Sequence, residues 1–162
     1  MNAASFEAIL ETLAANDVDF IVIGGLAAAL HGSAYVTQDV DVCYGRSPSS
    51  IEHLCHALAG LHPTLRGAPA GLPFHLDPVT VKAGLNFTLS TDLGPLDVLG
   101  EVAPFGGFEK LKPHAVVMSL GGRSVLVLSL AALIESKRSA GRPKDLLVVP
   151  ELEALLEMSK PS

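Results

Sequence analysis

Basic residues and cysteines are scarce in this sequence of 162 residues. Lysine and arginine together number 11 against 17 acidic residues, and the net charge is −6. Because binding along a phosphate backbone requires a basic surface, this balance argues against a protein that coats nucleic acid. Cys43 and Cys55 form no CxxC pair and have no matching histidine spacing. We therefore expect two small buried residues in a reducing compartment, and neither a disulfide framework nor a zinc site.

Long apolar runs are also missing. The longest apolar stretch, residues 20–30, is too short to cross a bilayer and contains two glycines. The N-terminal segment carries Glu7 and Glu11 and has no basic region, unlike a signal peptide. We therefore expect a cytoplasmic protein without membrane contact. The sequence has no Walker lysine loop and no GxGxxG motif, so it lacks the fingerprints of two common nucleotide-binding folds.

The composition favours a folded chain with a substantial core. Hydrophobic residues make up 49% of the sequence and charged residues 17%, which argues against disorder. This length suits one domain. We expect a single domain over residues 1–162, with C-terminal helices from about residue 129 packing on it.

One stretch, residues 20–44, organises the rest. The apolar run 20–23 predicts a buried strand, Gly24 and Gly25 break it, and a short helix of small residues follows over 26–30. A polar loop leads to a second predicted strand that contains Asp39 and Asp41. Since strand side chains alternate, both carboxylates lie on one face, where a divalent cation would offset their repulsion. The alternative is the exposed face of an edge strand.

The diglycine supports a ligand site in the same unit. Glycines at a strand-to-helix turn let a ligand approach the backbone, and the helix that follows presents free N–H groups. We therefore expect Gly24 and Gly25 to contact phosphate groups. Thr37, just before Asp39, either donates its hydroxyl to a phosphate or caps the entry to the strand.

Further along the sequence, a third aspartate and a basic cluster are also candidate site residues. Two predicted strands, 86–90 and 95–99, form a hairpin that would bring Asp97 into the same sheet as Asp41. In a predicted helix that begins after Ser129, Lys137 falls near the buried stripe, so it must extend to solvent or meet an anion. Four of the eleven basic residues gather here, which indicates either an anion site or cations at a helix C-terminus. They are Lys137, Arg138, Arg142 and Lys144.

The remaining pattern predicts elements that cover or extend the sheet. A first helix capped by Ser5 is expected over residues 5–16, and a second over about 48–61 behind Ser47. Residues 62–78 read as a long loop: either a surface connection or a flap in which Arg66 and His75 contact phosphate or substrate. A hairpin is expected over residues 115–128, around Gly121 and Gly122. After Gly141, two short helices are expected, one from Pro143 and one over 151–158.

The segments Ile23-Gly24-Gly25 and Asp39-Val40-Asp41-Val42, followed by Asp97, resemble the signature of the nucleotidyltransferase superfamily related to DNA polymerase beta. The minimal nucleotidyltransferase and type IV toxin–antitoxin branches look most similar. The resemblance implies an α/β fold, a mixed sheet flanked by helices, and a loop at residues 106–109 before the hairpin over 115–128. The sequence departs from the pattern at Tyr35 and Gln38, where basic residues are common, so positive charge near the triphosphate is reduced.

The resemblance also implies an activity: transfer of a nucleoside monophosphate from an NTP to an RNA, protein or small-molecule hydroxyl. Asp39, Asp41 and Asp97 would be catalytic in a two-metal mechanism. Asp39 and Asp41 would bridge one or two Mg²⁺ or Mn²⁺ ions, and Asp97 would complete the second ion. The nucleotide would contact Gly24, Gly25, Thr37, Lys137 and Asp145. The toxin–antitoxin branch adds the expectation of an antitoxin partner. The alternative function is a non-catalytic module, for nucleotide binding or protein interaction, that retains the fold.

Overall fold

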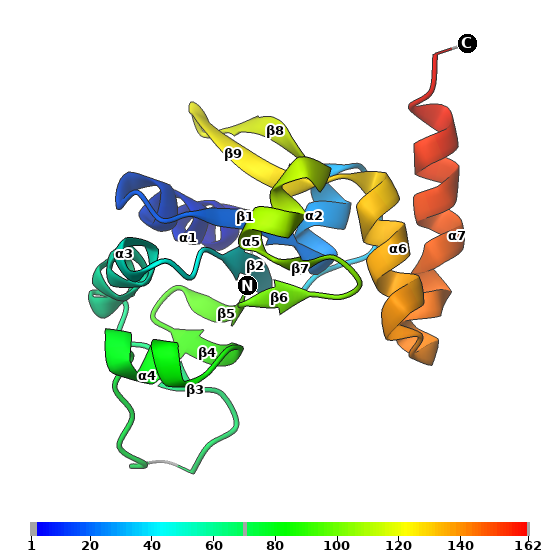
Figure 1. Ribbon diagram of the computed structural model, residues 1–162. Coiled ribbons are helices and arrows are strands. Elements are labelled where there is room, and N and C mark those ends of the chain that lie inside the picture. The colour runs from blue at the N-terminus through cyan, green and yellow to red at the C-terminus, as the bar shows by residue number, and fades with distance from the viewer. Residues whose placement is uncertain (1–2, 70, 162) are drawn as a thin grey trace.

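The computed structural model describes residues 3–69 and 71–161 (Figure 1). At its centre is a mixed seven-stranded sheet in the order β3-β4-β5-β2-β1-β9-β8. The strands are β1 (Phe20–Ile23), β2 (Val40–Tyr44), β3 (Thr64–Leu65), β4 (Phe87–Thr91), β5 (Gly94–Leu99), β8 (Ala115–Leu120) and β9 (Arg123–Leu128). A separate small ribbon pairs β6 (Glu101–Val102) with β7 (Gly106–Gly107). The predicted fold class, a mixed sheet flanked by helices, is confirmed.

Helices lie to the left and to the right of the sheet in Figure 1. They are α1 (Ala3–Ala15), α2 (Gly24–Leu30), α3 (Pro48–Ala59), α4 (Pro78–Ala83), α5 (Phe108–Leu111), α6 (Leu130–Ala140) and α7 (Pro143–Met158). A short 3-10 turn, Lys112–His114, follows α5. Helices α6 and α7 pack side by side at the right of Figure 1, while α1 and α3 pack together at the left. Helix α2 contacts α6, so the C-terminal helices pack against the segment formed by β1 and α2.

The alternation of side chains along β2 and β5 separates core from site. Val40 and Val42 of β2, and Leu96 and Val98 of β5, are fully buried. The residues between them, one on each strand, are aspartates that are only partly buried. Because neighbouring strand residues point to opposite faces, the apolar residues hold the core while the aspartates face away from it. Strand β1 is buried at all four positions, as its apolar run predicts.

Several predicted boundaries and caps are confirmed. The two hairpins form as antiparallel pairs, β4 with β5 and β8 with β9. The Ser47 and Ser129 side chains accept hydrogen bonds from the third residue after each, as N-caps do. Gly141 ends α6 with φ of 68°, the left-handed conformation that glycine adopts without strain.

Other predictions are wrong at the level of local structure. Helix α1 begins at Ala3, so Ser5 lies inside the helix and is not its cap. Helix α2 begins at Gly24 rather than after the diglycine. The two predicted C-terminal helices are one, α7, which continues through Pro150. Proline removes a helical hydrogen bond and usually ends a helix, which is why the pattern favoured two.

The segment expected as a long loop contains a short strand. Strand β3 pairs antiparallel with β4, extending the sheet by one strand. Helix α4, which begins at Pro78 and is capped by Asp77, was not predicted. At residues 106–109, where a loop was expected, β7 and the first residues of α5 lie instead. Two-residue strands and single helical turns carry too little periodicity to be read from sequence.

Both cysteines are free and buried, as expected. Burial raises the pKa of the Cys43 thiol to about 12, so this thiol stays protonated and unreactive at neutral pH. Among residues 3–69 and 71–161, no helix has the length and apolar character needed to span a bilayer.

Candidate active site

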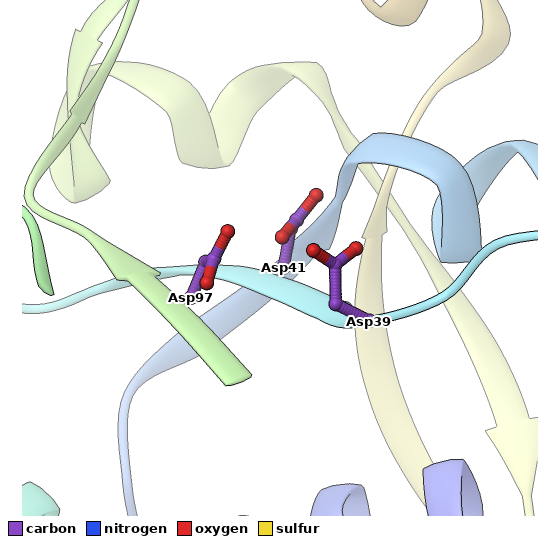
Figure 2. A group of neighbouring side chains, drawn as sticks. All are labelled: Asp39, Asp41 and Asp97. Carbon is purple, nitrogen blue, oxygen red and sulfur yellow. The ribbon is translucent and has the colours of Figure 1, made fainter. Parts of the chain in front are cut away.

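Three aspartates converge at the junction of β2 and β5. These strands pair in parallel, and Asp41 is the direct partner of Asp97. Asp39 was expected within the strand, but β2 begins at Val40, so Asp39 directly precedes it. Its side chain nevertheless points to the same side of the sheet as that of Asp41 (Figure 2). One carboxylate oxygen from each residue lies within 4.8 Å of the other two. The predicted position of Asp97, beside Asp41 in one sheet, is therefore confirmed.

Burial and the neighbouring carboxylates destabilise the charged forms of Asp39 and Asp41. The pKa of Asp41 rises to about 7, chiefly because its carboxyl is buried and also because Asp39 and Asp97 lie nearby. Burial likewise raises the pKa of Asp39, and the charge of Asp97 adds to this. Moreover, the Oδ1 atom of Asp41 is buried and has no hydrogen-bond partner among the described residues. A buried oxygen without a donor, in a cluster of hard oxygen ligands, fits a cation such as Mg²⁺ or Mn²⁺.

The diglycine makes room for the protein's own side chains. A Cβ on Gly24 would overlap the Asp41 carboxylate, and Gly24 has a left-handed φ of 63°. A Cβ on Gly25 would lie 2.8 Å from the Thr37 hydroxyl oxygen. That hydroxyl donates to the backbone carbonyl of Asp39 at 2.9 Å, so Thr37 supports the entry to β2. These glycines therefore permit close packing around the acids.

Residues 31–39, which lead into β2, are tied to distant parts of the chain. His31 Nε2 donates to the carbonyl of Leu128 at the end of β9, at 2.8 Å. The Ser33 hydroxyl and the Ala34 backbone N–H both donate to the Glu151 carboxylate on α7. Tyr35, by contrast, is exposed. The path of this loop is thus set by its first half, which is anchored to β9 and α7.

The basic cluster on α6 and α7, predicted as a possible anion site, is largely paired with carboxylates of the protein itself. Asp145 is 2% exposed and accepts hydrogen bonds from Arg142, at 2.5 and 3.1 Å, and from Lys137 at 3.4 Å. The Arg142 hydrogen bonds are the main reason why the pKa of Asp145 is lowered. Arg138 pairs with Glu153 at 3.0 Å. The anion that Lys137 meets in this structure is therefore Asp145.

Lys137 is also close enough to the acids to act on them. Its positive charge works against the rise in the pKa of Asp41. Lys144 acts in the same direction on Asp39. The basic cluster and the acidic cluster, some 100 residues apart in sequence at Asp41 and Lys137, thus form one electrostatic unit.

From the sequence, the role of Arg66 was left open and Glu151 was given no role. Arg66, expected to contact phosphate if the 62–78 segment were a flap, instead pairs with Asp97 and Asp39. Its signal was weak, because one basic residue in a region rich in proline and glycine resembles any surface residue. Glu151 was seen only as the start of a helix. His75, the second flap candidate, is not part of the acidic cluster.

The fold matches solved structures across nearly the whole chain. A provisionally named nucleotidyltransferase from Thermotoga maritima, known from a crystal structure, superposes with a TM-score of 0.59 at 15% identity. The match covers 93% of this chain and 94% of that one. The antibiotic-resistance factor ANT(2″)-Ia, solved in solution, superposes with a TM-score of 0.53 at 12% identity, covering 95% and 90% of the two chains.

No protein-family model matches the sequence, and neither does any curated protein. At identities this low, likeness of structure shows the fold and leaves the activity to be argued from the site. The chain has the nucleotidyltransferase fold. The resemblance found in the motifs around Gly24, Asp39 and Asp97 is therefore confirmed at the level of the fold.

Proposed function

We propose that this protein is a metal-dependent nucleotidyltransferase, which moves a nucleoside monophosphate from an NTP to an acceptor hydroxyl. One observation carries the proposal: the carboxylates of Asp39, just before β2, of Asp41 on β2 and of Asp97 on β5 converge within 4.8 Å on one face of the sheet. Three clustered acids repel one another, so the arrangement is favourable only with a compensating positive charge. The nucleotidyltransferase fold supports the same activity.

In this proposal Asp39 and Asp41 bind Mg²⁺ or Mn²⁺. The metal supplies positive charge that neutralises the triphosphate and the leaving pyrophosphate. Asp97 accepts the proton of the acceptor hydroxyl, whose oxygen forms a bond to the α-phosphorus as the bond to pyrophosphate breaks. The remaining work is positioning, for which a rigid pair of hydrogen-bonded strands is well suited.

The nucleotide contacts are proposed from the elements that border the acids. Gly24 and Gly25 present their backbone at the start of α2, next to Asp41. Thr37 is adjacent through Gly25, although its hydroxyl already donates to Asp39. Lys137 would offset phosphate charge, and Asp145 would hold Lys137 in place. The acceptor is an RNA, protein or small-molecule hydroxyl, and an antitoxin is the proposed protein partner.

A second candidate function is a non-catalytic module that binds nucleotides or another protein. It is favoured by the pairing of Arg66 with Asp97 and Asp39, which neutralises part of the acidic cluster without any metal. The neutral residues Tyr35 and Gln38, at positions where basic residues are common in the resembling family, point the same way.

Two measurements test the proposal. First, calorimetric titration with Mg-ATP compares the wild-type protein with the double variant Asp39→Asn, Asp41→Asn. We expect binding that is lost in the variant, and equal affinity would remove the metal site. Second, incubation with α-labelled NTPs and candidate acceptors should yield labelled product in the wild type only. Binding without any labelled product would favour the non-catalytic module.

A further inference from the structure

The guanidinium group of Arg66 lies among the three acids. Its Nη2 atom forms an ion pair with Asp97 Oδ1 and lies 3.7 Å from Asp39 Oδ2. Arg66 directly follows β3, so it reaches the site from the outer edge of the sheet, across β4. One positive charge therefore already faces two of the three carboxylates.

Arg66 is held by the sheet as well as by the acids. Its backbone N–H donates to the carbonyl of Thr88 at 2.9 Å, and its Nη1 donates to the carbonyl of Leu89 at 2.6 Å. The side chain is 29% exposed. Moving the guanidinium away from Asp97 would break both the ion pair and the bond to Leu89. These contacts hold the Arg66 side chain in the site, unlike that of a mobile surface arginine.

Asp41 differs from its two neighbours. Its Oδ1 atom is buried without a partner in the described part of the chain, and Arg66 forms no ion pair with it. Among the described residues of the cluster, the carboxyl that still lacks a positive partner is therefore that of Asp41, on the Asp39–Asp41 side. The Asp97 carboxylate already has a positive partner, the guanidinium of Arg66.

We propose that Arg66 occupies the second cation position, so that the site holds one divalent ion, bound by Asp39 and Asp41. The proposal rests on the function proposed above and deepens it. A second ion at Asp97 would have to displace a guanidinium that also bonds Leu89, and would face its positive charge at close range. Asp97 is thus held by an arginine, and Arg66 supplies a fixed positive charge beside the acceptor hydroxyl.

Counting bound ions tests this directly and needs no activity. Mn²⁺ is titrated into the metal-free protein, and free Mn²⁺ is measured by electron paramagnetic resonance. Sites that persist in the Asp39→Asn, Asp41→Asn double variant are subtracted as surface binding. We expect one ion in the wild type and two in Arg66→Met, which keeps an unbranched apolar stem but removes the charge.

Lys144→Met is the matched control. It removes the same charge from a residue that acts on Asp39 through its field and forms no ion pair with any described residue. We expect it to bind one ion. A second ion in this variant too would mean that general charge, rather than the Arg66 contact, limits the count, and would overturn the proposal.

A second variant covers the case in which Arg66→Met does not fold, as judged by circular dichroism. Asp97→Asn should still bind one Mn²⁺ in the presence of Arg66, with an affinity within about threefold of the wild type, a difference of under one kcal/mol. A loss of more than about tenfold would show that Asp97 ligates the ion and would contradict the proposal.

The outcomes separate this proposal from the function on which it rests. Two ions in the wild type, or one in a folded Arg66→Met, would overturn the role of Arg66 and leave the metal centre intact. No ion in any of the proteins would remove the metal centre itself, and the proposal for Arg66 with it.

Discussion

The carboxylate of Glu151 accepts a hydrogen bond from the hydroxyl of Ser33 at 2.5 Å, across 118 positions of sequence. Its other oxygen accepts the backbone N–H of Ala34 at 2.9 Å. These hydrogen bonds lower the pKa of Glu151. Helix α7 therefore fixes the start of the loop that delivers Asp39 to the site.

Removing this anchor should loosen the loop without unfolding the protein. We expect Glu151→Ala to increase hydrogen–deuterium exchange over residues 33–38, because two hydrogen bonds that order the loop are lost. The melting temperature should change little, since the contact lies near the surface. Glu157→Ala is the control: Glu157 lies on the same helix, and its ion pair among the described residues is with exposed Lys160. Equal exchange in the loop of both variants would contradict the anchoring role.

The acidic cluster should make the metal-free protein less stable as pH rises. Between its ordinary value of 3.8 and about 7, Asp41 keeps in the folded state a proton that it releases in the unfolded chain. The folded state thus binds more protons, and its unfolding free energy falls as pH increases through this window. We expect Asp41→Asn to remove this fall, and to be more stable than the wild type at pH 8 by about 1 to 3 kcal/mol.

Urea denaturation in EDTA at pH 5 and pH 8 measures the difference. Glu52→Gln, an exposed carboxyl on α3, is the control and should keep the pH dependence of the wild type. Added Mg²⁺ should restore stability to the wild type at pH 8, because binding to the folded state alone stabilises it. A wild-type protein as stable at pH 8 as Asp41→Asn would show that ionisation of the clustered carboxyls does not destabilise the metal-free protein.

Much of the site could be predicted from the sequence because its signals are local. Asp39 and Asp41 were placed on one face by the two-residue period of a strand, and their side chains do point to the same side, although β2 begins one residue after Asp39. Asp97 required one further step, that its hairpin joins the same sheet. The parallel pairing of β2 with β5, which sets Asp41 directly opposite Asp97, agrees with that step.

What could not be predicted depends on contacts between distant segments. Arg66 reaches the acids only because β3, a strand of two residues, pairs with β4. Glu151 reaches Ser33 only because α7 continues through Pro150. Neither a two-residue strand nor a proline inside a helix is visible in periodicity, so the residues that depend on them were missed or left open.

The ion pairs of Asp145 should contribute measurably to stability. Asp145→Asn leaves Lys137 and Arg142 without their buried carboxylate, and we expect a loss of about 1 to 2 kcal/mol at pH 7. Because the pKa of folded Asp145 is lowered, this contribution is present above the unfolded value near 3.8 and is lost as pH falls through the folded one. Urea denaturation at pH 7 and pH 3 measures both effects.

The exposed pair on the same helices provides the control for Asp145. Glu153→Gln breaks a pair with Arg138 in which both side chains are more than half exposed, and should change stability by less than about 0.5 kcal/mol. If Asp145→Asn changes stability as little as Glu153→Gln does, the buried carboxylate is not a structural anchor for Lys137.

Gly24 provides the most direct test that the backbone at the start of α2 is shaped around Asp41. An alanine Cβ there would overlap the Asp41 carboxylate, and alanine at a φ of 63° is itself strained by about 1 kcal/mol or more. We expect Gly24→Ala to lower stability and to weaken Mn²⁺ binding by more than about tenfold, because the carboxylate must move. Gly60→Ala is the matched control, since its Cβ would meet nothing within 4 Å and its φ is −72°. A Gly24→Ala protein that is folded and binds Mn²⁺ like Gly60→Ala would show that the metal ligands do not depend on this glycine.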